Sequence, residues 1–181
     1  MKNIIFLTGN QRKIREARSS CDLYDINVEP KSVFINEIQD HDPINITKQK
    51  ARDAFNAIKE PLIVNDAFWS ITALNGFPGG YMKDMTDWFK SIDFINLMKD
   101  KKDKSIIITD CTVYIDKNGM KVFSKKIPCE FVMKPKGKGS SIERVVMFNG
   151  KTLAEHHEDG NLAEKPDELI YFDFAKWYSN L

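Results

Sequence analysis

The sequence predicts an α/β protein with a mixed β-sheet and flanking helices, and three observations favour that class. A short apolar strand, a glycine turn and a helical pattern follow one another at the N-terminus. A second helical pattern leads into a buried-strand run, and a hairpin signal stands in the second half of the chain. The 181 residues contain no internal repeat and no separating linker, so we expect one domain over residues 1–181.

Two strands and two helices are predicted in the first half of the chain. Asn3 to Leu7 is a β-rich apolar run that ends at Thr8-Gly9-Asn10, and helical spacing follows it. The next helix should run from Pro43 to Ile58, because proline suits the first turn and apolar residues recur three and four positions apart. Leu62-Ile63-Val64 indicates a buried strand that ends at the polar pair Asn65-Asp66.

The second half adds two helices and a hairpin. A third helix is predicted from Asp84 to Met98, where large apolar side chains recur on one stripe. The strand runs Ser105 to Ile115 and Met120 to Phe123 flank Asp116-Lys117-Asn118-Gly119, which is typical of a hairpin turn. A last helix should begin near Pro166 and end at Tyr178. This order of elements favours a mixed sheet with helices packed around it.

Composition and charge exclude several classes of protein. Apolar residues make up 42% of the chain, which is a globular proportion and excludes bulk disorder. The net charge of +1 gives no global basic field that would hold a nucleic-acid polymer. No stretch approaches the roughly 20 apolar residues of a membrane span, and the three distant cysteines fit no disulfide framework or zinc spacing. We therefore expect a reduced, soluble, cytoplasmic protein that binds neither nucleic-acid polymer nor membrane.

The junction between the first strand and the first helix is a candidate anion site. Backbone N–H groups and the positive end of the helix dipole favour negative charge at such a junction. Gly9 lets the backbone approach a phosphate and Lys13 adds a mobile positive charge, although the spacing is not that of a Walker loop. The alternative is a tight turn followed by a solvated lysine.

Glu37 and Asp66 are candidate metal-binding carboxylates. Glu37 lies just before the second helix, and Asp66 lies at the expected carboxyl end of a strand, where open α/β sheets place their ligand residues. Two such carboxylates can hold a Mg²⁺ ion that keeps most of its water. The alternative is that Asp66 caps a turn and Glu37 is solvated.

Lys50 is a candidate phosphate ligand because it interrupts an otherwise small and apolar face of the second helix. One interpretation is a lysine held against a phosphate. The other is a lysine whose stem covers apolar surface while its ammonium group reaches water.

In order and spacing, these segments resemble the inosine triphosphate pyrophosphatase family. The motif T-G-N-x-x-K-x-x-E matches Thr8, Gly9, Asn10, Lys13 and Glu16. Later blocks match Asn36-Glu37-Ile38-Gln39-Asp40, then Pro43, Ile46, Lys50 and Ala51, then Asn65-Asp66-Ala67-Phe68-Trp69 and the segment from Ala73 to Tyr81. Five blocks in the right order over the first 81 residues make the resemblance specific.

The resemblance implies an elongated mixed sheet with flanking helices, two lobes around a central nucleotide cleft, a homodimer and dependence on Mg²⁺. It implies a single nucleoside triphosphate pyrophosphatase-like domain that hydrolyses non-standard purine nucleotides, such as ITP, XTP or their deoxy forms, to monophosphate and pyrophosphate. By position, the residues that would grip the triphosphate are Thr8, Gly9, Asn10, Lys13 and Lys50. Glu37 and Asp66 would be the catalytic and metal-binding carboxylates, with Asp66 orienting or deprotonating the attacking water.

The base-reading half departs from the family pattern. The family's S-H-R segment falls on Leu169-Ile170-Tyr171, which cannot form the same hydrogen bonds to a base edge. Asn65 and Ala67 replace the E and S/T that flank the motif's aspartate. The candidate base pocket consists of Phe68, Trp69, Glu143 and Lys165. We therefore expect an altered base preference.

Two other functions remain open at this point. The chain could be a catalytically impaired relative that binds nucleotide as a sensor or partner module. It could also be a pyrophosphatase for a pyrimidine or modified nucleotide.

Overall fold

A computed structural model describes residues 2–36, 38–40, 42–158 and 164–181. The strands are β1 (Lys2–Leu7), β2 (Ile26–Lys31), β3 (Leu62–Ile71), β4 (Pro78–Gly79), β5 (Ser105–Asp116), β6 (Gly119–Phe131), β7 (Val146–Phe148) and β8 (Lys151–Thr152). The helices are α1 (Gln11–Cys21), α2 (Pro43–Ile58), α3 (Met82–Trp88), α4 (Ser91–Met98), α5 (Leu153–Glu158) and α6 (Ile170–Ser179). Short 3-10 turns occupy Asp22–Tyr24, Thr72–Leu74 and Glu143–Val145.

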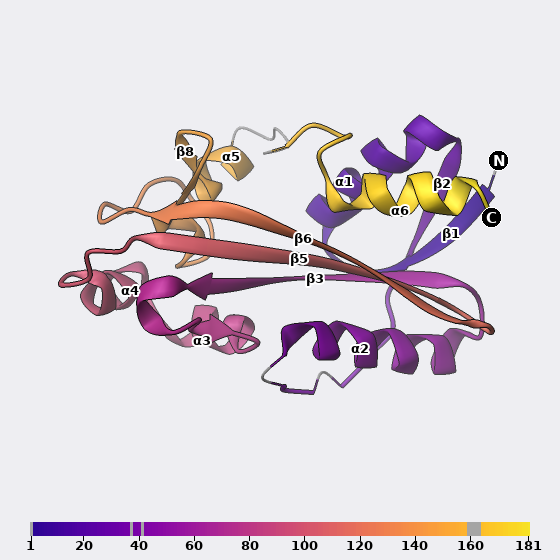
Figure 1. The fold of residues 1–181 in the computed structure, drawn as a ribbon, viewed down its shortest axis with the longest axis horizontal. Coiled ribbons are helices and arrows are strands. Elements are labelled where there is room, and N and C mark those ends of the chain that lie inside the picture. The colour runs from indigo at the N-terminus through magenta and orange to yellow at the C-terminus, as the bar shows by residue number, and fades with distance from the viewer. Residues whose placement is uncertain (1, 37, 41, 159–163) are drawn as a thin grey trace. The chain divides into compact units, whose positions relative to one another are not determined.

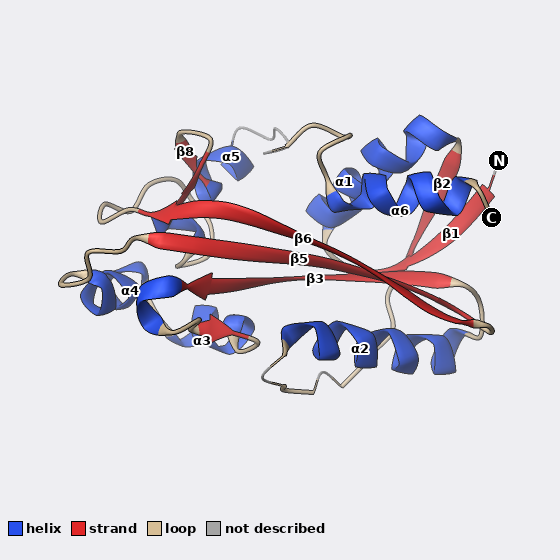
Figure 2. Cartoon of the chain, in the orientation of Figure 1, coloured by secondary structure: helices blue, strands red, loops and turns tan. Residues whose placement is uncertain are grey.

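The strands form one mixed sheet, which confirms the predicted α/β class (Figure 2). The strand order is β2-β1-β3-β5-β6-β7-β8, and β4 pairs with β3 outside this path. Strand β1 is parallel to both β2 and β3, whereas β7 is antiparallel to β6 and β8. Because parallel neighbours need a crossover connection, α1 and α2 lie between these strands in the chain.

The chain divides into two compact units. The first comprises residues 1–67, 110–125 and 164–181, and the second comprises residues 68–109 and 126–163. In the first unit, α1 and α6 lie side by side on one face of the sheet and α2 lies on the other (Figure 1). The rings of Phe6 in β1 and Tyr171 in α6 pack edge to face, 5.6 Å between centroids, and both residues are buried. Burial of these large side chains between β1 and α6 stabilises this part of the sheet.

Strand β3 is longer than the sequence predicted. We expected it to end at Asn65-Asp66, but it continues to Ile71, so Asp66 does not lie at a strand end. The prediction was wrong because it took two polar residues for a turn signal. Both side chains instead find partners elsewhere in the first unit, which removes the cost of placing them within a sheet.

The predicted helix from Asp84 to Met98 is in fact two helices, α3 and α4. The break lies at Phe89 and Lys90, whose backbones are extended. The turn at this point lets the Phe89 ring pack against Phe94, 5.2 Å between centroids. The carboxylate of Asp93 accepts the N–H of Lys90 at 2.8 Å and so stabilises the start of α4. Packing of Phe89 and capping by Asp93 therefore divide this segment into two helices, although its apolar residues fit one continuous helix.

Other elements agree with the sequence or extend it. Helix α2 has the predicted bounds, and Asp42 caps its first turn by accepting the N–H of Ile44. The predicted hairpin joins β5 and β6, where the Asp116 carboxylate accepts the N–H groups of Asn118 and Gly119. Strand β2 was not predicted, and α6 begins at Ile170 rather than near Pro166.

No disulfide joins any two of Cys21, Cys111 and Cys129. Burial raises the pKa of Cys21 and of Cys111 to about 12, so neither is a reactive thiolate at neutral pH. Within the described part of the chain, no helix has the length and apolar character needed to cross a membrane.

Candidate functional site

The turn between β1 and α1 is built by local hydrogen bonds. The Asn10 side-chain oxygen accepts the N–H groups of Arg12 at 2.9 Å and Lys13 at 3.4 Å, which caps the helix. The Thr8 hydroxyl oxygen accepts the N–H of Asn10 at 3.1 Å. Gly9 is exposed, and no described atom lies within 4 Å of the position that a Cβ would take there. The strand, turn and helix follow one another as predicted, and there is open space for an anion at Gly9. The N–H groups of Arg12 and Lys13 already donate to the Asn10 side chain.

Lys13 reaches from α1 to strand β3. Its Nζ donates to the backbone oxygen of Asn65 at 2.8 Å. The pairing of β1 with β3 consists of Ile5 with Leu62 and Phe6 with Ile63, so β3 continues past the end of β1. The Lys13 ammonium occupies this region beyond the carboxyl end of β1, which is where parallel sheets bind ligands.

Lys50 forms an ion pair with Asp66. The Lys50 Nζ donates to the Asp66 Oδ1 at 2.7 Å, and the two side chains are 16% and 18% exposed. The second carboxylate oxygen, Oδ2, is buried and accepts no hydrogen bond from the described residues. An ionised carboxylate with one oxygen paired and one available can accept a proton from water or bind a cation.

Asn65 faces a different set of partners. Successive side chains of a strand point to opposite faces, so Asn65 and Asp66 diverge. The Asn65 Nδ2 donates to the Asp110 Oδ1 at 2.6 Å and to the Thr112 Oγ1 at 3.1 Å. Both acceptors lie on β5, two residues apart and therefore on one face. The two lysines thus reach neighbouring residues of β3, and Asp110 contacts one of these residues, Asn65, from β5.

Asp110 is a site residue that the sequence reasoning missed. The signal was present, because Asp110 is a single acidic residue within an apolar strand run from Ile106 to Ile115. Protein atoms packed around its carboxyl group raise its pKa from 3.8 to about 6, and hydrogen bonding by Asn65 opposes that rise. Burial lowers the pKa of Lys13, and the charges of Asp66 and Asp110 oppose that shift.

This raised pKa predicts that Asp110 costs stability at neutral pH. Since the folded state holds the proton more tightly, the carboxyl group contributes stability below about pH 4 that is lost as the pH rises through about 6. Asp110→Asn should therefore raise the free energy of unfolding above about pH 7 by on the order of 3 kcal/mol, and the gain should vanish below about pH 4. Urea denaturation of both proteins at these two pH values checks this. A difference that does not change with pH would contradict the assignment.

The candidate base-pocket residues belong to both units. Phe68 and Trp69 are each 7% exposed, which favours a packing role for their rings. The Glu143 carboxylate accepts the Ser140 N–H at 3.0 Å, and Lys165 is exposed on the segment before α6. Glu143 lies in the second unit and Lys165 in the first, so their joint role in base binding stays a prediction.

The segment that replaces S-H-R is part of the core of the first unit. Leu169, Ile170 and Tyr171 are 6%, 1% and 1% exposed. The Tyr171 hydroxyl is buried, has no hydrogen-bond partner among the described residues, and burial raises its pKa well above the usual value. These side chains stabilise the packing of α6 on the sheet.

Only one of the two candidate metal-binding carboxylates can be placed. Glu37 lies outside the described residues. Among the residues that the structure describes, no group of three His, Cys, Asp or Glu side chains could hold a metal ion. Mg²⁺ does not require such a group, because it commonly binds through one or two carboxylates, substrate phosphates and water. The buried, unbonded Oδ2 of Asp66 is compatible with that type of binding.

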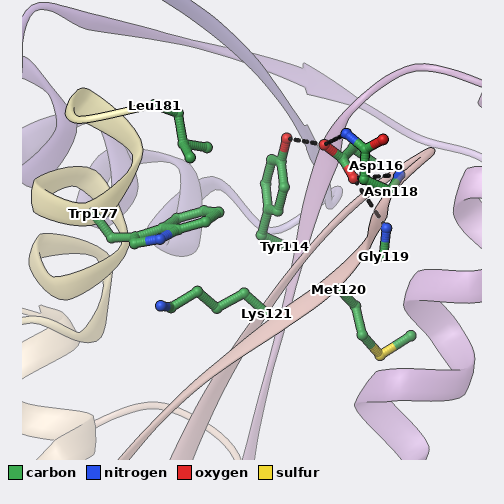
Figure 3. Close-up of a pocket in the computed structure, with 8 residues that line it drawn as sticks. All are labelled: Tyr114, Asp116, Asn118, Gly119, Met120, Lys121, Trp177 and Leu181. Atoms are coloured by element: carbon green, nitrogen blue, oxygen red, sulfur yellow. Dashed lines mark hydrogen bonds between the residues drawn. The ribbon is translucent and has the colours of Figure 1, made fainter.

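Figure 3 shows a pocket of about 410 Å³ in the first unit, between the β5–β6 hairpin and α6. The Asp116 carboxylate accepts the Tyr114 hydroxyl at 3.2 Å, and the Lys121 ammonium lies 4.9 Å from the Trp177 ring centre. These groups stabilise the hairpin against α6, and none of the predicted site residues lines the pocket. A second pocket of about 410 Å³, in the second unit, is lined by Ala73, Leu74, Asn75, Phe77, Phe89, Leu97 and Lys101.

Comparison with known proteins agrees with this fold. The chain is 24% identical over 180 residues to a dITP/XTP pyrophosphatase of Methanosarcina mazei, covering 98% of both chains. It is 30% identical over 152 residues to an inosine triphosphate pyrophosphatase of Fusarium vanettenii, covering 83% of this chain and 82% of the relative. A solved HAM1 protein of Coxiella burnetii has the same fold, with a TM-score of 0.82, 17% identity and full coverage of both chains.

The family model that matches the chain covers most of its length. It is the model of the Ham1 family, and it spans residues 4–161. The match includes the β1–α1 turn, helix α2 and strand β3, which carry the lysines and carboxylates described above. The chain therefore belongs to the Ham1 family.

Proposed function

We propose that the protein is an enzyme that hydrolyses nucleoside triphosphates to a monophosphate and pyrophosphate, with non-standard purine nucleotides such as ITP and XTP among its substrates. One observation carries the proposal: the ammonium groups of Lys13 and Lys50 reach the adjacent residues Asn65 and Asp66 from two different helices. The names of the relatives, dITP/XTP pyrophosphatase and inosine triphosphate pyrophosphatase, support it.

The proposed reaction breaks the bond between the α and β phosphates. The oxygen of a water molecule attacks the α phosphorus, Asp66 accepts the proton, and pyrophosphate leaves with the bridging oxygen. Lys13 and Lys50 neutralise the charge that develops on the phosphates. Since Lys50 pairs with Asp66 at 2.7 Å, its transfer to a phosphate would release the carboxylate to act as the base.

Asp66 and Glu37 are the residues that would hold Mg²⁺. The ion would supply positive charge against the triphosphate and orient it. The support is the chemistry of the two carboxylates and the available Oδ2 of Asp66.

A panel of triphosphates tests the proposed function. Release of pyrophosphate should be measured for ITP, XTP, GTP, ATP, CTP and UTP, each with Mg²⁺ and with excess EDTA. Metal-dependent release from purine triphosphates is the expected result. Binding without release would instead indicate an impaired relative that senses nucleotide, and release from pyrimidine nucleotides alone would indicate the other alternative.

We expect a weak base preference, because the segment at the S-H-R position is buried in the core. A site that hydrogen-bonds a base edge rejects analogues strongly, whereas an apolar pocket discriminates by only about 10- to 200-fold. The ratio of kcat/KM for ITP and GTP should therefore stay below about 200. A preference for ITP above about a thousandfold would mean that other residues rebuild the base reader.

A further inference from the structure

Asp110 is connected to Lys13 through Asn65, which contacts both residues. Asn65 is buried, with 4% of its surface exposed, and two elements hold it. Its side chain donates to Asp110 at 2.6 Å, and its backbone oxygen accepts from the Lys13 Nζ at 2.8 Å. Asn65 thus links a carboxylate on β5 to an ammonium group on α1.

The charges around Lys13 also indicate a role for Asp110. Two lysines converge on β3, and an ammonium group removed from water needs a nearby negative charge. The Oδ1 of Asp66 is already paired with Lys50. Asp110 contacts the Asn65 side chain, and its charge acts on Lys13 together with the charge of Asp66.

A purely structural role does not explain an acid at this position. An asparagine at position 110 would accept the same hydrogen bond from Asn65 without placing a charge in the protein interior. The charge of the carboxylate at position 110 therefore lowers the stability of the fold, and the hydrogen bond from Asn65 does not require that charge.

We propose that Asp110 is a positioning residue of the phosphate site: its carboxylate accepts the Asn65 side chain, and its negative charge stabilises the charged Lys13 ammonium, which Asn65 also binds, where a phosphate can bind. This inference rests on the proposed function in one respect, since it takes Lys13 to be a phosphate ligand.

Exchange of the two hydrogen-bonded side chains tests the inference. Asp110→Asn keeps the shape and the hydrogen bond but removes the charge. The double variant Asn65→Asp with Asp110→Asn keeps the charge in the pair and reverses the direction of the hydrogen bond. The probe is inorganic tripolyphosphate in excess EDTA, with its dissociation constant measured by calorimetry and folding checked by thermal melting. Asp167→Asn, on an exposed residue, is the control.

The expected result is that Asp110→Asn weakens tripolyphosphate binding about tenfold, as for loss of one charge-assisted interaction. The reversed pair should bind within about threefold of the parent, and the same order should appear in KM for nucleotide rather than in kcat. Unchanged binding by Asp110→Asn would make Asp110 merely structural, and tighter binding would mean that its charge only repels phosphate. A folded reversed pair that binds no better than the single variant also overturns the inference.

These outcomes differ from a failure of the proposed function. A parent protein that binds tripolyphosphate but releases pyrophosphate from no nucleotide contradicts the proposed function alone. A parent protein that does not bind tripolyphosphate overturns the positioning role of Asp110.

Discussion

Replacing Asp66 by asparagine is expected to lower the rate of pyrophosphate release at saturating triphosphate by on the order of 10²–10⁴. The asparagine keeps an oxygen that can accept the hydrogen bond from Lys50, which spans 2.7 Å in the parent. It cannot accept a proton from the attacking water, so the loss should appear in kcat while the fold is retained. Steady-state kinetics together with thermal melting measure the two effects.

A control variant tests whether loss of a negative charge elsewhere in the chain has the same effect as loss of the Asp66 charge. Asp167 is exposed on the segment before α6, and Asp167→Asn should leave turnover unchanged. If Asp66→Asn turns over within a few-fold of the parent, the carboxylate is not the base. Its role would then be the ion pair with Lys50 alone.

The parts of the site that local patterns encode could be predicted from the sequence. The Thr8-Gly9-Asn10 turn was predictable because strand, turn and helix signals follow one another, and Asn10 caps α1 as an asparagine in this place should. Helix α2 was predictable because proline, spacing and length agree. Lys50 was identified because it interrupts the apolar face of that helix.

The parts that depend on tertiary partners could not be predicted. Asn65 and Asp66 indicated a strand end, because nothing in the local sequence shows that Asp110 and Lys50 will satisfy them. Asp110 was missed for the same reason, since its significance comes from its contact across the sheet. Strand β2 was missed because Pro30 and the polar residues around it weaken the strand pattern, while pairing with β1 over six residues compensates.

Removing either lysine ammonium should weaken triphosphate binding far more than nucleoside binding. Lys13 and Lys50 approach adjacent residues of β3 from α1 and α2, so each can contact the phosphates separately. A charge-assisted hydrogen bond contributes on the order of 1.5–3 kcal/mol, which corresponds to losses of about 10- to 150-fold for Lys13→Ala and for Lys50→Ala. Calorimetric titration with a non-hydrolysable triphosphate, and then with the matching nucleoside, separates the phosphate contribution from the base contribution.

Helix α2 offers a control for this experiment. Arg52 is an exposed cation two residues from Lys50, and its guanidinium donates to the Gln49 side chain at 3.2 Å. Arg52→Ala removes one positive charge from the same helix and should change triphosphate affinity by less than about threefold, because an exposed charge is screened by solvent and salt. Lys50→Met retains most of the side-chain stem beside Asp66 and distinguishes loss of charge from loss of packing. If Lys50→Met binds triphosphate as tightly as the parent, Lys50 serves the ion pair with Asp66 and does not bind phosphate.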